Sequence, residues 1–248
     1  QSVYLLPPDT ALESEVLALY SKNVGGFYDP HDRVLYLLAG ADMSTQMLVI
    51  AHELAHAVQD ERLGLANLTR ERSWSEDSQL ALMAAIEGQA QAVAAVYIAD
   101  QIDPSLADIL TSGAADMASH AAVMSDAPLW LSSQMSFPYA AGAKLVQAVR
   151  GDDRTARDLI LKLPASTAQV ITPELYKRSQ APLTGQIGLV KALAGAEPIY
   201  DTVLGRMNID LLPTLHEGPE NLGEGWRGDR LEVVRHGGAA VAVWSLVF

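Results

Sequence analysis

The segment Met47–Asp60, MLVIAHELAHAVQD, contains the motif His-Glu-x-x-His. On a helix, His52 and His56 are four residues apart, which places them about 40° apart around the axis and one turn along it. Two imidazoles on one face can bind one zinc ion, and Glu53 beside them can act as the base for a water molecule that the metal activates. The segment therefore predicts a helix that carries part of a metal site.

The residues around the motif favour a buried helix. Most positions between Met47 and Val58 are apolar, and no Pro or Gly occurs from Gln46 to Arg62. Ser44 or Thr45 is the expected N-cap, and Gly64 is expected to end the helix. A chance match is the alternative explanation, but the chain has only six histidines. Charged and polar side chains inside so apolar a segment are costly without a partner, which favours a metal.

A second long helix is predicted from about Glu76 to about Ile98. Within it, Glu87 interrupts an otherwise apolar surface, and a metal would supply the partner that this carboxylate needs. Gly88 lowers helix stability, so we expect it to allow close packing against a neighbouring helix. These features make Glu87 the expected third metal ligand, and the alternative is a glutamate that faces solvent.

Three protein ligands leave one position open, which distinguishes a catalytic zinc from a structural one. Glu53 would take a proton from the attacking water and transfer it to the leaving amine. A further side chain would stabilise the oxyanion. Tyr139 is the first candidate because it follows Pro138 at a predicted helix start, and three others remain open, each with a packing or surface role as its alternative. These are His120, Tyr176 and His216.

A zinc-bound imidazole usually donates its second ring N–H to another side chain. Gln91, four residues after Glu87, could accept this hydrogen bond through its amide oxygen. Asp60, four residues after His56, is the other candidate, with a solvated position at the helix end as the alternative.

The remaining pattern predicts an α+β fold that is mostly helical, in one domain spanning residues 1–248. Short strands at Gly26–Tyr28 and Arg33–Leu38 predict an N-terminal β-hairpin, and Val34–Leu38 is a candidate strand for pairing with an extended substrate. Leu231–Arg235 and Ala239–Phe248 predict a C-terminal hairpin that turns at His236–Gly238. Helices are also predicted at Leu12–Tyr20, Asp103–Ser125, from Phe137 through Val149, at Asp152–Leu161, after a capping box at Ser166–Gln169, and at Pro198–Leu212.

Composition limits the possible partners and environments. The net charge of −13 and pI of about 4.7 argue against nucleic acid or an anionic membrane as the main partner. Without cysteine, the chain has no disulfides, thiolate ligands or cysteine nucleophile. No run approaches 18 uninterrupted apolar residues, so no transmembrane helix is predicted. Because the sequence begins at Gln1, an N-terminal segment is expected to be missing, which favours an exported protein over a cytoplasmic one.

HELAHAVQD with a downstream glutamate on a second helix resembles the gluzincin zinc metallopeptidases, the thermolysin-like clan. The resemblance implies a zincin-like core of two central helices, Zn²⁺ as the cofactor and a peptide or protein as the substrate. It implies His52, His56 and Glu87 as ligands and Glu53 as the catalytic base. In that clan an Asp usually lies four residues after the ligand Glu, and here Gln91 takes its place.

A narrower resemblance, to a group of bacterial metallopeptidase-like proteins, covers most of the chain. It is carried by Gly26–Asp29, HELAHAVQDE, Glu87–Ala90, Pro138–Gly142, Pro164–Val170 and Gly225–Arg230. Members tend to have His-Pro after the Ser-Thr-x-Gln turn, where this chain has Thr172-Pro173. The predicted function is zinc-dependent hydrolysis of peptide bonds. The alternatives are a gluzincin-like scaffold that binds metal or a protein partner without turnover, and a helical structural protein without metal.

Overall fold

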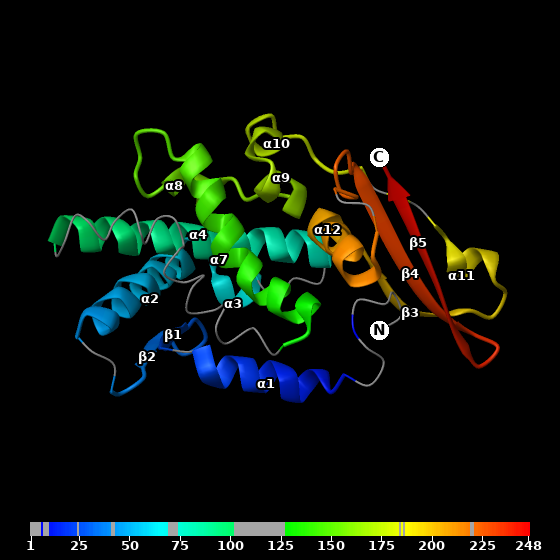
Figure 1. Cartoon of the computed structure of the whole chain (residues 1–248), viewed down its shortest axis with the longest axis horizontal. Helices are drawn as coiled ribbons and strands as arrows, with labels where there is room; N and C mark the ends of the chain where they lie inside the picture. Colours follow the sequence, from blue (N-terminus) through cyan, green and yellow to red (C-terminus); the bar gives the residue numbers. More distant parts are fainter. Residues whose placement is uncertain are drawn as a thin grey trace.

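One long helix, α4 (Glu76–Gln101), runs through the middle of the molecule, and the other elements pack around it (Figure 1). The computed structural model describes Leu6 and residues 10–23, 25–40, 43–68, 74–101, 127–183, 185, 187–218 and 221–248. The predicted helix Asp103–Ser125 therefore lies outside the described residues. In chain order, the other elements are α1 (Leu12–Asn23), β1 (Gly26–Asp29), β2 (Val34–Leu37), α2 (Met43–Leu63), α3 (Leu65–Leu68), α7 (Leu129–Val149), α8 (Arg157–Leu161), α9 (Thr167–Ile171), α10 (Pro173–Lys177), α11 (Leu189–Ala192), β3 (Glu197–Thr202), α12 (Gly205–His216), β4 (Gly228–His236) and β5 (Ala239–Val247).

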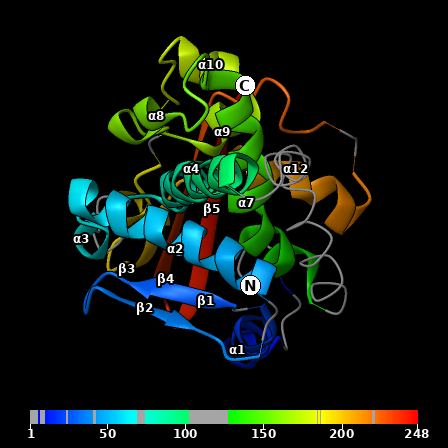
Figure 2. The same cartoon turned by 90° about the vertical axis from the view of Figure 1, so that its left-hand side faces the viewer.

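The described elements confirm the predicted fold class, which is α+β and mostly helical with two small antiparallel sheets. Strands β1 and β2 pair as the predicted N-terminal hairpin. Helix α2 lies between this hairpin and α4 (Figure 2). The motif helix is therefore covered on two sides, where residues such as Ala51 and Ala55 are buried, but the prediction of a buried helix holds only in part because Leu54 and Val58 are more than half exposed.

Helices α4 and α7 cross at a point where both carry a glycine. A Cβ atom on Gly88 would lie 2.4 Å from the carbonyl carbon of Gly142, and one on Gly142 would lie 2.1 Å from the carbonyl oxygen of Ala84. The two backbones touch here, so the prediction that Gly88 serves close packing is confirmed. Apolar side chains of both helices, including Ala81, Ala85 and Leu145, continue the contact as the main core cluster.

A three-stranded sheet, β3-β4-β5, stands at the end of the molecule near the N-terminus of α4 (Figure 1). The predicted hairpin is confirmed as β4 and β5, and its turn at Gly237 and Gly238 has positive φ at both positions, as a two-residue turn requires. The predicted helix Pro198–Leu212 is wrong in its first part. Glu197–Thr202 forms β3 because β4 supplies antiparallel partners, and only Gly205–His216 is helical.

Three helix starts also differ from the predictions. Helix α2 begins at Met43, so Ser44 and Thr45 lie inside it rather than capping it. Helix α7 begins at Leu129 and contains Pro138, because burial of its apolar face outweighs the loss of one backbone donor. Only the second half of the predicted helix Asp152–Leu161 is helical, as α8.

Two predicted helix boundaries are confirmed. Gly64 follows α2 with a φ of +65°, a conformation that glycine adopts without strain. Ser166 caps α9 by accepting a hydrogen bond from the backbone N–H of Gln169. The side chain of Gln169 accepts from the N–H of Ala165 at 2.7 Å, so it binds the residue before the N-cap rather than Ser166 itself, as a capping box would.

Two buried aspartates join the C-terminal sheet to the helices. Asp229 on β4 accepts hydrogen bonds from the backbone N–H groups of Leu204 and Gly205 and from two indole N–H groups. Asp77 on α4 accepts from the backbone N–H and the hydroxyl of Thr167 on α9. Among the described residues neither Asp77 nor Asp229 has a cationic partner, so backbone, hydroxyl and indole donors compensate for their burial.

By length and composition alone, α4 could cross a membrane, with a mean hydropathy of 1.3 over its most apolar window. In the structure, 78% of that window is buried against the rest of the chain. Packing inside the protein therefore accounts for its apolar character.

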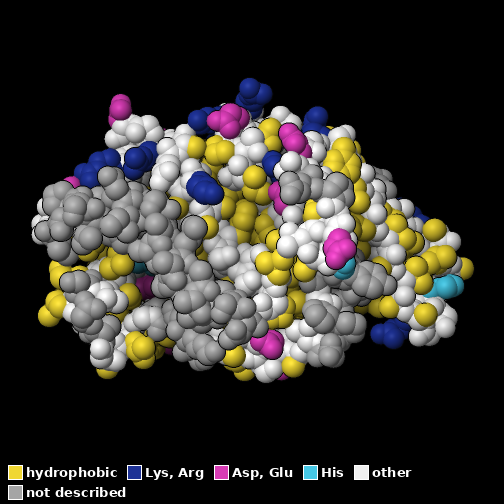
Figure 3. Space-filling view, viewed as in Figure 1, with side chains coloured by type: hydrophobic (Ala, Val, Ile, Leu, Met, Phe, Trp, Pro, Cys, Tyr) yellow, Lys and Arg dark blue, Asp and Glu magenta, His cyan; other side chains and the backbone are white. Residues whose placement is uncertain are grey.

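Charged side chains on the face seen in Figure 3 gather along the edge that α8 and α10 form, with both signs interspersed. The ion pairs there, Arg157–Asp153 and Lys177–Glu174, are largely exposed. Exposed pairs of this kind contribute little to stability. The fold therefore depends mainly on the apolar core and on the buried hydrogen bonds described above.

The Gly88–Gly142 contact predicts a large effect of a single methyl group. Gly142→Ala should lower the free energy of unfolding by about 3 kcal/mol, because the new Cβ overlaps the backbone of α4. Lys144→Ala, on the exposed side of the same helix, is the control and should change it little. Chemical denaturation of the three proteins measures the difference, and equal stability of Gly142→Ala and wild type would contradict the contact.

Asp77 predicts a pH dependence of stability. Burial, together with the charge of Asp229, raises the pKa of Asp77 to about 7, against opposing hydrogen bonds from Thr167. The folded state therefore holds this proton more tightly than the unfolded state, so stability is lost as pH rises from about 4 to about 7.

Asp77→Asn should remove that loss, which is about 4 kcal/mol, while its amide oxygen still accepts both bonds from Thr167. Asp158→Asn, exposed on α8, is the control. Denaturation curves at pH 4 and pH 8 provide the measurement. A pH dependence of Asp77→Asn equal to that of wild type would contradict this assignment.

Candidate metal centre

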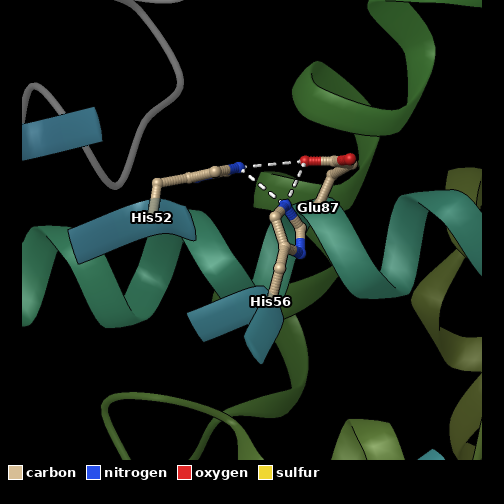
Figure 4. A group of neighbouring side chains, drawn as sticks. All are labelled: His52, His56 and Glu87. Carbon is tan, nitrogen blue, oxygen red and sulfur yellow. Dashed lines mark hydrogen bonds and ion pairs between the residues drawn. The ribbon is translucent and has the colours of Figure 1, made fainter. Parts of the chain in front are cut away.

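Helices α2 and α4 bring three potential metal ligands to one point (Figure 4). His52 and His56 project from α2, and Glu87 projects toward them from α4. The Nε2 atoms of the two histidines are 3.0 Å apart. Oε2 of Glu87 lies 3.1 Å from Nε2 of His52 and 3.4 Å from Nε2 of His56. The three donor atoms therefore form a nearly equilateral triangle, although the residues come from two helices.

The size of this triangle fits a tetrahedral metal. For bonds of 2.0–2.1 Å, the edge of a tetrahedron of ligand atoms is about 3.3 Å. The side chains of His52, His56 and Glu87 are 16%, 13% and 9% exposed, so the cluster is shielded but reachable. Two imidazoles and one carboxylate are a donor set that zinc accepts. The three residues thus satisfy both the spacing and the chemistry of a metal site.

Charge in the cluster is balanced between the carboxylate and the imidazoles. Burial alone would lower the pKa of His56, but the negative charge of Glu87 and the hydrogen bonds that His56 donates to Glu87 and Gln59 raise it to about 9. Burial would likewise raise the pKa of Glu87, but the charge of His56 and hydrogen bonds from both histidines hold it well below its usual range. A cation at the centre could replace the proton on His56 as the partner of Glu87.

Glu53 lies on a different side of α2 from the two histidines and is buried. Its Oε2 accepts a hydrogen bond of 2.8 Å from the backbone N–H of Tyr28 on β1. Burial raises the pKa of Glu53, and the neighbouring His52 and His56 oppose the shift. A raised pKa lies closer to neutral pH, and a general base works best when its pKa is near the working pH.

The N-terminal hairpin reaches this site through β1. The carbonyl of Gly25 accepts from the N–H of Leu38 near β2, so by alternation the N–H of Tyr28 points away from β2 and toward Glu53. Both strands of the hairpin contact α2, and the backbone N–H that reaches Glu53 comes from β1. Pairing of Val34–Leu38 with an extended substrate stays a prediction.

One predicted outer partner of the histidines, Asp60, is not the observed one. Asp60 accepts hydrogen bonds from the hydroxyl of Tyr28 and the N–H of Leu65, and no bond to His56 is present. Instead, Oε1 of Gln59 lies 2.8 Å from Nδ1 of His56. Sequence reasoning missed Gln59, although its position three residues after His56 places both on one face of α2.

Of the three candidate oxyanion donors that the structure describes, Tyr139 is the one that it brings to the cluster. Its ring stacks beside His52, with ring centroids 6.4 Å apart and an angle of 26°. Tyr176 is buried in the core, and its hydroxyl donates to the carbonyl of Lys162 at 2.6 Å. His216 is exposed at the end of α12, and His120 lies outside the described residues. Tyr139 reaches the site because α7 crosses α4, not because it begins a helix.

An apolar cavity of about 510 Å³ lies between α2 and α4, away from the three ligands. Residues of α2 such as Ile50, Leu54 and Val58 line it, together with Val93 and Tyr97 of α4. None of the cluster residues contributes to its walls. The candidate metal site and this cavity therefore lie on different faces of the motif helix.

Comparison with known proteins gives one match. Residues 10–123 match the model of a family described as "Putative metallopeptidase family (DUF6782)". No curated protein and no solved structure matches the chain. The matched segment includes His52, Glu53, His56 and Glu87 and ends before Tyr139. Together, the match and the geometry of the cluster suggest a metal-dependent peptidase.

The raised pKa of His56 predicts how metal binding depends on pH. A metal must displace the proton that His56 holds below about pH 9, so affinity should rise with pH, by up to about tenfold per unit. Calorimetric titration with zinc at pH 6.5, 7.5 and 8.5, in buffers of different ionisation enthalpy, should detect about one proton released. An affinity that stays constant over this range would contradict the assignment.

Proposed function

We propose that this protein is a zinc-dependent peptidase of the gluzincin type, with a zincin-like core formed by α2 and α4. His52, His56 and Glu87 would hold the metal. When bound there, zinc supplies a Lewis acid that activates water and polarises the carbonyl of the scissile peptide bond. The observation that supports this proposal is the triangle of three donor atoms with edges of 3.0 to 3.4 Å.

Glu53 is the proposed general base. The backbone N–H of Tyr28 donates a hydrogen bond to one oxygen of the Glu53 carboxylate. This bond fixes the orientation of the carboxylate and leaves the second oxygen for proton transfer. Glu53 would accept a proton from the attacking water and then donate it to the amine that leaves. Its raised pKa suits both steps, since the group must bind the proton and release it near neutral pH.

Tyr139 is the proposed oxyanion donor. Its ring lies beside His52, so the side chain of Tyr139 borders the same site. A phenol keeps its proton at neutral pH and can donate a hydrogen bond to the negative oxygen of a tetrahedral intermediate.

Thr172, at the position that motivated the alternative of a scaffold without turnover, has a structural role in this chain. Its hydroxyl accepts a hydrogen bond of 2.8 Å from Arg206 and ties the junction of α9 and α10 to α12. It therefore has a structural partner outside the triangle of ligands.

A test of the base separates chemistry from metal binding. Glu53→Gln should retain zinc and the fold, because its amide oxygen can still accept from Tyr28, but peptide hydrolysis should fall by at least about 100-fold. Glu61→Gln, exposed on the same helix, is the matched control and should keep wild-type activity. Zinc content and the cleavage of a broad peptide library are measured on all three proteins. Wild-type turnover by Glu53→Gln would refute the proposed role of Glu53.

A further inference from the structure

We propose that Gln59 is a positioning residue that fixes the tautomer of His56 and holds the two ligand-bearing helices in register. The proposal rests on the metal site proposed above. It assigns a role to a side chain that is not one of the proposed ligands and that the motif itself does not include.

The first observation is the orientation of the Gln59 amide. Its Nε2 lies 2.9 Å from the carbonyl oxygen of Ile86 and 2.6 Å from Oε1 of Gln89. A backbone carbonyl can only accept a hydrogen bond, so the atom facing Ile86 must be the amide nitrogen. Both of its N–H groups are then used, and Oε1 is the atom that faces His56.

The orientation of Gln59 determines the protonation of the imidazole. Because Oε1 of Gln59 can only accept, Nδ1 of His56 must carry the proton in their 2.8 Å hydrogen bond. In the neutral ring, Nε2 is then left with its lone pair, and this atom is the one directed at His52 and Glu87. The free imidazole is therefore held in the tautomer that a metal requires.

Gln59 also joins the two helices that carry the proposed ligands. Gln59 belongs to α2, whereas Ile86 and Gln89 belong to α4 and flank the ligand Glu87 on either side. Gln59 and Gln89 are only 3% and 7% exposed, so the network is shielded from water and its hydrogen bonds are costly to break. The amide of Gln59 thus orients His56 on α2. It also binds the turn of α4 that carries Glu87, the proposed third ligand.

The experiment compares zinc affinity and tautomer in matched variants. Gln59→Met keeps the length of the side chain but cannot accept from His56 or donate to α4. It should bind zinc roughly 10- to 100-fold more weakly than wild type in a chelator competition assay. Gln79→Met, exposed on α4, is the control and should bind as wild type does. Two-bond ¹H–¹⁵N spectra of ¹⁵N-histidine-labelled, metal-free protein at pH above 9 report the tautomer, with His56→Ala used for assignment.

In wild type, His56 should be protonated at Nδ1, and in Gln59→Met both tautomers should be populated. Unchanged affinity together with an unchanged tautomer in Gln59→Met would overturn the proposal. If Gln59→Met does not fold, Gln89→Ala decides instead: it removes one acceptor of the Gln59 amide and should lower the affinity several-fold. Unchanged affinity in that variant would then overturn the proposal. Failure of wild-type protein to bind zinc would refute the metal site itself, which is a distinguishable result.

Discussion

A buried carboxylate held between two imidazoles is the interaction on which the rest of the account depends. Glu87 is buried on the long central helix α4, where a lone negative charge would be unstable. His52 and His56 compensate for it across the interface between α2 and α4. The two helices must therefore pack at a fixed separation and register, and the surrounding structure supplies the means to hold them there.

One turn of α4 provides most of these contacts. The carbonyl of Ile86 anchors Gln59, Glu87 faces the histidines, Gly88 touches the backbone of α7, and Gln89 accepts from Gln59. The Gly88–Gly142 contact brings α7 close enough for Tyr139 to reach the cluster. At its N-terminal end, α4 is fixed by Asp77 to α9 and by its backbone to the segment that follows β3. The site is thus built on rigid elements rather than on loops, as accurate placement of ligands requires.

The sequence predicted local features well and contacts between distant segments less well. The spacing of His52 and His56 needs only a helix, and Glu87 could be recognised because a charge among apolar residues demands a partner. The glycine at position 88 indicated a close helix contact but not that its partner is Gly142. Strand β3 was missed because residues 197–202 become a strand only when β4 pairs with them, and that partner lies more than twenty residues later.

The hydrogen bonds around the ligands likewise depend on contacts between segments that are distant in the sequence. Asp60 looked like a partner for His56 by helical spacing, but β1 approaches α2 and its Tyr28 hydroxyl takes the carboxylate. Gln59 gains its significance only when Ile86 and Gln89 of α4 fix the direction of its amide. Tyr139 was selected for a helix start that does not exist, and it lies beside His52 because of how α7 crosses α4.

The most direct test of the account is an anomalous difference map of zinc-loaded crystals, measured on both sides of the zinc absorption edge. A zinc ion held by the three proposed ligands should give one strong peak about 2.0 to 2.2 Å from Nε2 of His52, Nε2 of His56 and a carboxylate oxygen of Glu87, with one coordination position free of protein ligands. A peak bound by other residues, or no peak in protein shown to be folded and exposed to zinc, would contradict the proposed metal site.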